Sequence, residues 1–169
     1  MSDIICKKYV ASTTLESLKA IDTALISDNS INMTLLILAI RHGKTETARS
    51  IIEKNEASLS EKNNGGWTAL HFAARYGYTD IVKLIIEKNE TCLAQKNNIV
   101  WTALHLAARY GETGVATLII EKYPEGLTEK DDSGLTALKI ARQSGHTRTA
   151  EAIESFNKAT NDSSPGISP

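Results

Sequence analysis

Apolar residues occur in two short blocks that alternate along the chain, and the same arrangement returns every 34 residues. The first block of one copy places three residues on one side of a short helix: Leu70, Ala73 and Ala74. The second block forms an apolar stripe with a period of about 3.6 residues: Ile81, Val82, Ile85 and Ile86. Each copy is therefore predicted to be a pair of helices.

Four sets of identical residues share this spacing. They are Thr34, Thr68, Thr102 and Thr136; Gly43, Gly77, Gly111 and Gly145; Thr45, Thr79, Thr113 and Thr147; and Leu25, Leu59, Leu93 and Leu127. One helix pair cannot bury both of its faces, so neighbouring copies must stack and share a core. The period therefore predicts a solenoid.

Local signals place the turns within each copy. A turn at Asn63–Gly66 precedes the first helix, Gly77 is expected to end that helix in the left-handed conformation, and Thr79 is expected to cap the second helix. Val100 stands where two other copies carry Gly66 and Gly134. Because a β-branched residue disfavours positive φ, we expect the turn over residues 97–100 to differ from its neighbours.

The tetrapeptide Thr-Ala-Leu-His, at residues 68–71 and 102–105, resembles the Thr-Pro-Leu-His signature of ankyrin repeats. The motif favours that family over tetratricopeptide repeats, which are also helix pairs of this length. The resemblance covers roughly residues 29–156. It implies an all-α ankyrin-repeat solenoid of helix-turn-helix units joined by hairpin-like turns, with four repeats near 29–62, 63–96, 97–130 and 131–156.

The two ends of the chain depart from the repeat pattern. Residues 1–28 are interpreted as a degenerate N-terminal capping repeat, since Leu25 keeps the spacing. In the last copy Lys139 replaces the motif histidine and Arg142 replaces an alanine, as a polar terminal face requires. Residues 157–169 are rich in Ser, Asn, Pro and Gly, so we expect a disordered tail there.

Composition narrows the range of functions. The net charge is −1, which disfavours binding to nucleic acid or an anionic membrane through a global basic field. No apolar run reaches the roughly 18 residues of a membrane helix. The two cysteines, Cys6 and Cys92, form no disulfide framework or metal motif. We expect a monomer in the cytoplasm or nucleus, or in the host cytosol if the chain is a bacterial effector, with no cofactor.

The resemblance implies a protein-binding surface made of the turn tips and the exposed face of the first helices. The expected contacts precede the motif threonine (Met33, Trp67, Trp101 and Leu135), precede the helix-ending glycine (Arg41, His42, Arg75, Tyr76, Arg109 and Tyr110), or lie at the tips (Asn64, Asn98, Ile99 and Asp132). Trp, Tyr and Arg are enriched in interface hot spots, and the arginines favour a partner with an acidic or aromatic-bearing surface. Alternatively, the pattern reflects duplication only, with the tryptophans packed on their own helices.

The motifs support a catalytic function less well than they support protein binding. His71 and His105 are expected to be structural hydrogen-bonding residues beside Thr68 and Thr102, and Gly77, Gly111 and Gly145 to be structural helix ends. Gly43-Lys44-Thr45 lacks the first glycine of a phosphate loop, because that position is Leu38. We therefore expect no enzyme. The alternative function is binding of a nucleic acid or phosphate ligand through the arginine set and the lysine set, Lys62, Lys96 and Lys130.

Overall fold

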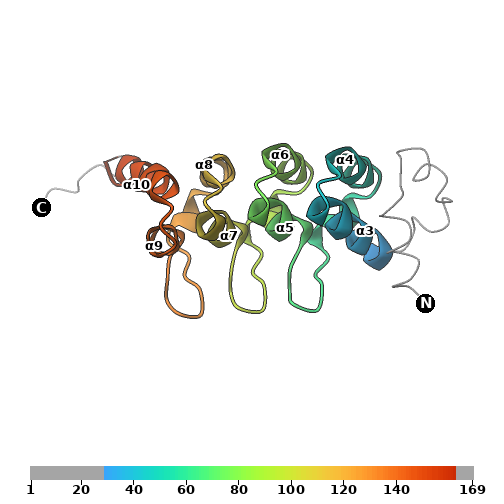
Figure 1. Cartoon of the computed structure of the whole chain (residues 1–169), viewed down its shortest axis with the longest axis horizontal. Coiled ribbons are helices and arrows are strands. Elements are labelled where there is room, and N and C mark those ends of the chain that lie inside the picture. The colour runs from blue at the N-terminus through green and yellow to red at the C-terminus, as the bar shows by residue number, and fades with distance from the viewer. Residues whose placement is uncertain (1–28, 163–169) are drawn as a thin grey trace, which may run out of the picture.

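The computed structural model describes residues 29–162. The predicted N-terminal capping repeat and residues 163–169 of the predicted tail lie outside the described residues. Within them the chain forms pairs of helices that stack in one direction (Figure 1). The predicted all-α solenoid is confirmed.

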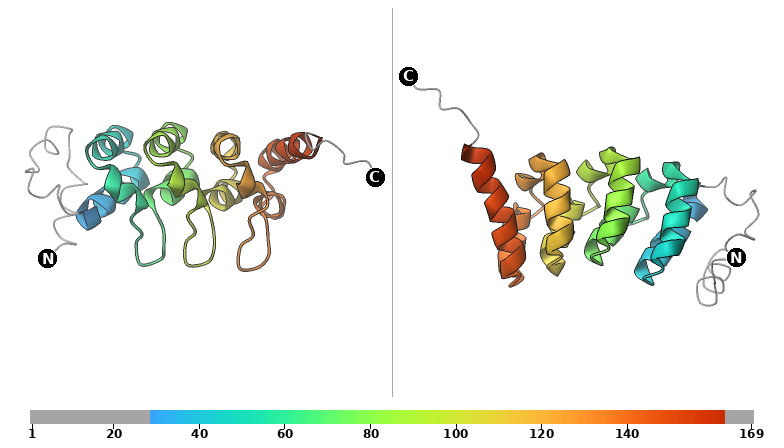
Figure 2. Two further views of the ribbon diagram at one scale, coloured as in Figure 1. Left: turned by 180° about the vertical axis from the view of Figure 1, so that it is seen from behind. Right: turned by 90° about the horizontal axis from the view of Figure 1, so that it is seen from above.

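The helices form two layers, which we call inner and outer. The inner helices are α3 (Asn29–Arg41), α5 (Ala69–Arg75), α7 (Ala103–Tyr110) and α9 (Ala137–Gln143). The outer helices are α4 (Thr45–Lys54), α6 (Thr79–Lys88), α8 (Thr113–Lys122) and α10 (Thr147–Asp162). Seen from above, the outer helices lie side by side along the array (Figure 2).

A short 3₁₀ helix follows each of the first three outer helices: η1 (Glu56–Ser60), η2 (Glu90–Ala94) and η3 (Pro124–Leu127). A loop then leads to the next inner helix. We call residues 61–68, 95–102 and 128–136 the finger loops. They project from the inner helices on the side away from the outer layer (Figure 1).

One continuous core runs between the layers and between the repeats. Ala73 and Ala74 are fully buried, and these small side chains let neighbouring inner helices pack closely. Leu70 and Leu104 extend the same core, and the outer helices contribute aliphatic residues such as Ile85. Because each repeat buries its neighbour's face, no repeat completes a core alone.

The first described repeat departs from the expected pattern. Helix α3 begins at Asn29, whereas its register counterparts begin at Ala69, Ala103 and Ala137. Met33 therefore lies inside a helix and is only 7% exposed. Its expected role as an exposed contact is wrong. The residue in register with Gly66 is Asn32, so this copy lacks the glycine that turns the finger loop.

The last helix also runs further than expected, because α10 continues to Asp162. Residues 157–162 are therefore helical rather than part of a disordered tail. Phe156 packs against the core near the expected boundary, and the helix continues about 1.7 turns beyond it.

The expectation of a different turn at residues 97–100 is wrong. Val100 adopts a φ of 59°, close to the 76° of Gly66 and the 73° of Gly134. The Val100 amide donates to the Asn97 carbonyl at 3.0 Å, the same bond that Gly66 makes to Asn63 at 2.8 Å. The hydrogen-bond pattern of the finger loop thus holds a valine in the left-handed region.

The expected capping by Thr79 is also wrong. The residue at the N-cap of α6 is Tyr78, and Thr79 is the first residue of the helix. From that position its hydroxyl faces the Gly77 carbonyl at 3.5 Å instead of the free amides of the first turn. Gly77 has a φ of 73°, the left-handed conformation expected at the end of α5.

Candidate protein-binding surface

The motif threonine and histidine close the start of two inner helices. In α5 the hydroxyl of Thr68 lies 2.8 Å from Nδ1 of His71, and the Thr68 amide donates to the same nitrogen at 3.2 Å. Thr102 and His105 repeat both distances in α7. Each pair forms a capping box that satisfies amides at the helix start.

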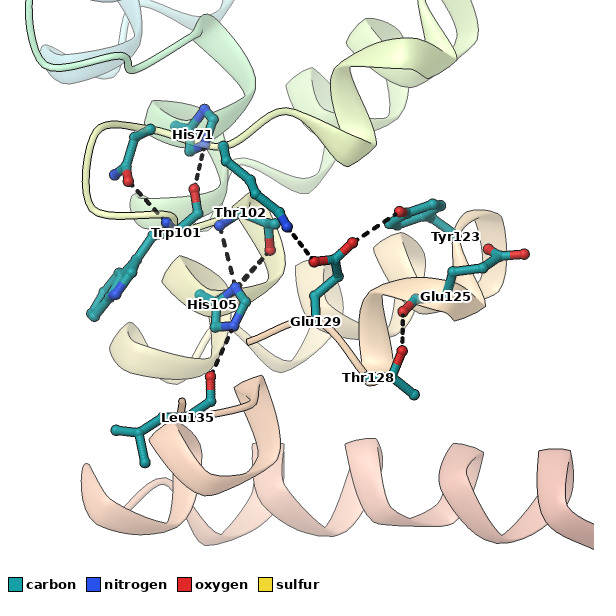
Figure 3. A network of polar contacts seen from close by, with 11 residues as sticks. His71, Trp101, Thr102, His105, Tyr123, Glu125, Thr128, Glu129 and Leu135 are labelled. Carbon is teal, nitrogen blue, oxygen red and sulfur yellow. Dashed lines mark hydrogen bonds and ion pairs between the residues drawn. The ribbon is translucent and has the colours of Figure 1, made fainter. Parts of the chain in front are cut away.

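The other nitrogen of each ring ties one repeat to the next (Figure 3). Nε2 of His71 lies 2.9 Å from the Trp101 carbonyl, and Nε2 of His105 lies 3.3 Å from the Leu135 carbonyl. Because a backbone amide can only donate, Nδ1 carries no proton and Nε2 donates to the carbonyl. The two histidines therefore link the inner helices to the finger loops that follow.

Both histidine rings are neutral. Burial lowers the pKa of His71 to about 4, and burial also lowers the pKa of His105. Both nitrogens of each ring are already used by protein partners, so neither is free to bind a metal or accept a proton from a substrate. This geometry favours a structural role for both residues.

One side chain braces each finger loop from within. Oδ1 of Asn63, Asn97 and Asp131 accepts two backbone amides of its own loop, at distances between 2.8 and 3.1 Å. Neighbouring loops are also joined, because the Asn98 amide donates to the Gly65 carbonyl and the Asn98 side chain donates to the Asn64 carbonyl, both at 3.0 Å. The tips of the second and third repeats therefore form one ordered surface.

The sequence predicted that both tryptophans would be exposed contacts at the loop tips, but neither side chain is free in the structure. Both are half-buried. The Trp67 ring lies 5.1 Å from that of Phe72 on its own inner helix. Nε1 of Trp101 instead donates to Oδ2 of Asp131 at 3.1 Å, in the next finger loop. Trp67 thus packs on its own helix, as the duplication alternative expects. Trp101 also stacks on His105 of its own helix, at 6.5 Å between ring centres, and in addition joins two repeats.

Three aromatic rings from two repeats surround the guanidinium of Arg75. Its central carbon lies 4.9 Å from the ring centre of Tyr110, 5.6 Å from Tyr76 and 5.9 Å from Trp67. These distances are within the range of cation–π attraction. We call these four residues the Arg75 cluster. The structure thus brings together four of the residues that the sequence singled out.

The other expected contact residues are more dispersed. Arg109 is exposed, and its Nη1 donates to the Ser144 hydroxyl at 2.9 Å. Leu135 is half-buried, and the remaining expected residues are exposed: Arg41, His42, Asn64, Asn98 and Asp132. Among the described large apolar residues, the exposed ones are Ile99, 50% exposed at a finger tip, and Tyr110, 43% exposed at the end of α7.

Asp131 and Phe72 were not singled out from the sequence. Asp131 is an aspartate where the two preceding finger loops carry Asn63 and Asn97, and this change supplies the acceptor for the Trp101 indole. Phe72 stands in register with Leu106, and its ring gives Trp67 a surface to pack on. Both departures from the repeat are visible in the sequence, but their partners are not.

Residues 29–162 give little support for metal binding, membrane spanning or a reactive cysteine. They contain no group of three His, Cys, Asp or Glu side chains that could hold a metal ion. The described helices include none with the length and apolar content needed to cross a bilayer. Cys92 is buried with its thiol facing the Leu59 carbonyl, and burial raises its pKa, which keeps the thiol protonated and unreactive.

Comparison with known proteins gives a consistent result. No curated protein matches the sequence. A family model described as ankyrin repeats in three copies matches residues 9–96, and a single ankyrin-repeat model matches residues 101–129. The first match alone spans more than half of the chain and begins within the segment interpreted as a degenerate capping repeat. This chain belongs to the ankyrin-repeat family.

Proposed function

We propose that this protein is a non-enzymatic binding scaffold, an adaptor or inhibitor, that holds an acidic segment of a partner protein against its inner helices and finger loops. Ankyrin repeats generally mediate protein–protein interaction. The observation that carries the proposal for this chain is the way in which charge is divided between its two layers.

The inner helices contain basic residues and no acidic residue. The basic residues are Arg41, Arg75, Arg109, Lys139 and Arg142. Arg142 is paired with Glu154 at 2.8 Å, and the other four form no ion pair within the described residues. The outer helices α4, α6 and α8 are balanced. Their acids are Glu46, Glu53, Asp80, Glu87 and Glu121, and their bases are Arg49, Lys54, Lys83, Lys88 and Lys122.

This division favours an acidic partner against the inner helices, whereas the three balanced outer helices give no preference. The finger loops carry both signs at exposed positions: Glu61, Lys62, Lys130 and Asp132. A positive surface steers an acidic partner towards it and excludes basic ones. The Arg75 cluster and the exposed side chains of Ile99 and Tyr110 add apolar contact area of the kind found at interface centres.

Binding to nucleic acid has less support. Two of the three lysines proposed for it are engaged within the protein. Lys62 donates to the Lys96 carbonyl at 2.9 Å, and Lys96 is paired with Glu129. The remaining members of the two sets are Arg41, Arg75, Arg109 and Lys130. Four basic residues are few for a binding mode that depends on many phosphate contacts.

The test is affinity capture from a cell lysate with the full chain as bait, followed by quantitative mass spectrometry. The inner variant carries Arg75→Ala, Arg109→Ala and Tyr110→Ala, all at positions with exposed or half-exposed side chains. We expect it to lose the proteins that the wild type captures. Circular dichroism must show that the variant keeps the helix content and unfolding midpoint of the wild type to within a few degrees.

The control carries Arg49→Ala, Lys83→Ala and Lys122→Ala on the outer helices, so it removes three positive charges from the other layer, one more than the inner variant loses. We expect it to capture the same proteins as the wild type. Equal loss with both variants would show that only net charge matters, and undiminished capture by the inner variant would place binding elsewhere. Captured material that disappears after nuclease treatment would instead support the nucleic-acid alternative.

A further inference from the structure

We infer that Arg75 is a preorganised receptor for one carboxylate of the partner segment, and that an apolar side chain next to that carboxylate packs on the exposed ring of Tyr110. The inference rests on the proposed function and makes it more specific, because it assigns the recognition of an aspartate or glutamate to one side chain. The surrounding rings, the unused donors and the charge of the inner helices each support it.

The aromatic rings hold the Arg75 guanidinium in place. Tyr76 and Trp67 belong to the same repeat as Arg75, whereas Tyr110 belongs to the next one, so the cluster closes only when the two repeats stack. The Tyr76 ring is itself stacked on Tyr78, at 6.2 Å between ring centres. An arginine held in this way loses less side-chain entropy on binding than a free one.

The donors of this guanidinium are unused by the protein. Among residues 29–162, no oxygen accepts a hydrogen bond from the Arg75 side chain, and no carboxylate pairs with it. The Glu112 carboxylate lies against Gly77, which is two residues after Arg75 in the sequence. Glu112 nevertheless forms no ion pair with Arg75. A planar, half-buried guanidinium with free N–H groups matches a carboxylate, which can accept two parallel hydrogen bonds.

The repeat before and the repeat after do not build the same site. Arg75 contacts Tyr110, which is 35 residues further along the chain. Arg109 in the same way contacts the residue 35 positions after it, which is Ser144. Because that counterpart is a serine, Arg109 has an internal hydrogen bond and no aromatic ring over it. Arg41 is exposed and lies over no ring among the described residues. One arginine of the set is therefore distinguished by its surroundings.

The surroundings also favour a peptide carboxylate over a free inorganic phosphate. The inner helices themselves contain no acidic residue, although the Glu112 carboxylate lies against Gly77, and the Tyr110 ring offers an apolar surface beside the positive charge. A side chain such as leucine or phenylalanine adjacent to an aspartate or glutamate satisfies both features. A lone inorganic anion would interact with the positive charge but would make no use of the apolar Tyr110 ring.

The experiment starts with a phage library of random peptides of about 12 residues, selected on the immobilised full chain. We expect the enriched peptides to contain Asp or Glu next to an aliphatic or aromatic residue. The enriched peptide is then labelled, and its dissociation constant is measured by fluorescence anisotropy on the wild type, Arg75→Lys, Arg75→Gln, Tyr110→Ala and Arg148→Gln. Arg75→Lys keeps the charge but removes the planar fork, and Arg148→Gln is the control, because it removes one exposed positive charge from the outer helix α10.

We expect Arg75→Gln to weaken binding roughly tenfold or more and Arg75→Lys at least about fivefold, with less than about twofold for Arg148→Gln. Changing the peptide acid to its amide should weaken binding to the wild type and have little further effect on Arg75→Gln. Equal effects of Arg75→Gln and Arg148→Gln, full affinity with Arg75→Lys, or a selection without binders would overturn the inference.

Two further outcomes separate this inference from the proposed function. If the selected peptides ignore Arg75 but lose affinity for the inner variant, the inner surface binds proteins and the carboxylate receptor is wrong. If they bind the inner variant as tightly as the wild type, the proposed surface itself is wrong. A phosphoserine peptide that binds while its carboxylate counterpart does not would show that the site is specific for phosphate and overturn the inference.

Discussion

Two glycines with nearly the same backbone conformation should differ in their tolerance of alanine. Gly66 and Gly134 occupy the same place in the second and fourth repeats, with φ values of 76° and 73°. A left-handed conformation costs an L-residue about 1–2 kcal/mol, and the reduced freedom of the unfolded chain returns roughly 0.4–1 kcal/mol of that. This backbone contribution is common to both sites and amounts to about 1 kcal/mol.

The surroundings of the added methyl group separate the two sites. At Gly134 a Cβ atom would have no neighbour within 4 Å. At Gly66 it would press on the side-chain oxygen of Asn98 and come within 2.8 Å of the Asn98 amide nitrogen. The Asn98 amide and side chain donate the hydrogen bonds that join the two finger loops. At about 0.5–1.5 kcal/mol each, losing both bonds brings the expected cost of Gly66→Ala to about 2–4 kcal/mol.

Urea unfolding followed by circular dichroism measures both free energies. The m-value should stay equal to that of the wild type in both variants, because a changed slope would mean that cooperativity had been lost. Tryptophan fluorescence reports on the finger loops themselves, because Trp67 and Trp101 are the two tryptophans of the chain and both lie in these loops. Costs that agree within about 0.3 kcal/mol, or a larger cost at Gly134, would refute the reasoning that loop-to-loop contacts decide the difference.

The remaining predictions concern the valine turn, the indole acceptor and the buried histidine. Val100→Gly should raise the free energy of unfolding by up to about 1 kcal/mol, because it removes the left-handed cost of a β-branched residue; a lower urea midpoint would contradict this. Asp131→Asn should lower it by about 1–3 kcal/mol, because Nε1 of Trp101 loses its acceptor, and a variant as stable as the wild type would show that this bond contributes nothing. Unfolded His71 binds a proton below about pH 6.5 but the folded ring only below about 4, so its contribution of about 3 kcal/mol is complete above pH 6.5 and is lost as the pH falls towards 4. The variant His71→Gln should therefore show a flatter loss of stability over that pH range, and an unchanged slope would argue against a buried neutral ring.

The sequence predicted well the features that depend on residues close together in the chain. The capping box needs only a threonine and a histidine three residues apart, and the helix exit needs only a glycine such as Gly77. Local energetics largely decide such features, so reading the repeat was enough to find them. The error at Thr79 was a shift of a single position within a local motif.

The errors elsewhere have a different cause. The turn at Val100 was judged from the preference of one residue, but the hydrogen bonds of the loop outweigh that preference. Met33 was placed by register, but the missing turn glycine lets the helix extend through it. The tryptophans were predicted to be exposed because the turn tips of ankyrin repeats are usually exposed. In the structure Trp67 packs on Phe72, and Trp101 donates a hydrogen bond to Asp131.

The sequence by itself determined the order of the helix pairs, their register and the fact that they stack on one another, because one helix pair cannot bury its apolar stripes without its neighbours. Only the tertiary structure decided which surface residues act together. Arg75 and Tyr110 are 35 residues apart, and their contact depends on the distance and rotation between adjacent repeats and on side-chain rotamers. Periodicity specifies neither of these, so the one arginine that differs from its counterparts became visible only in the folded array.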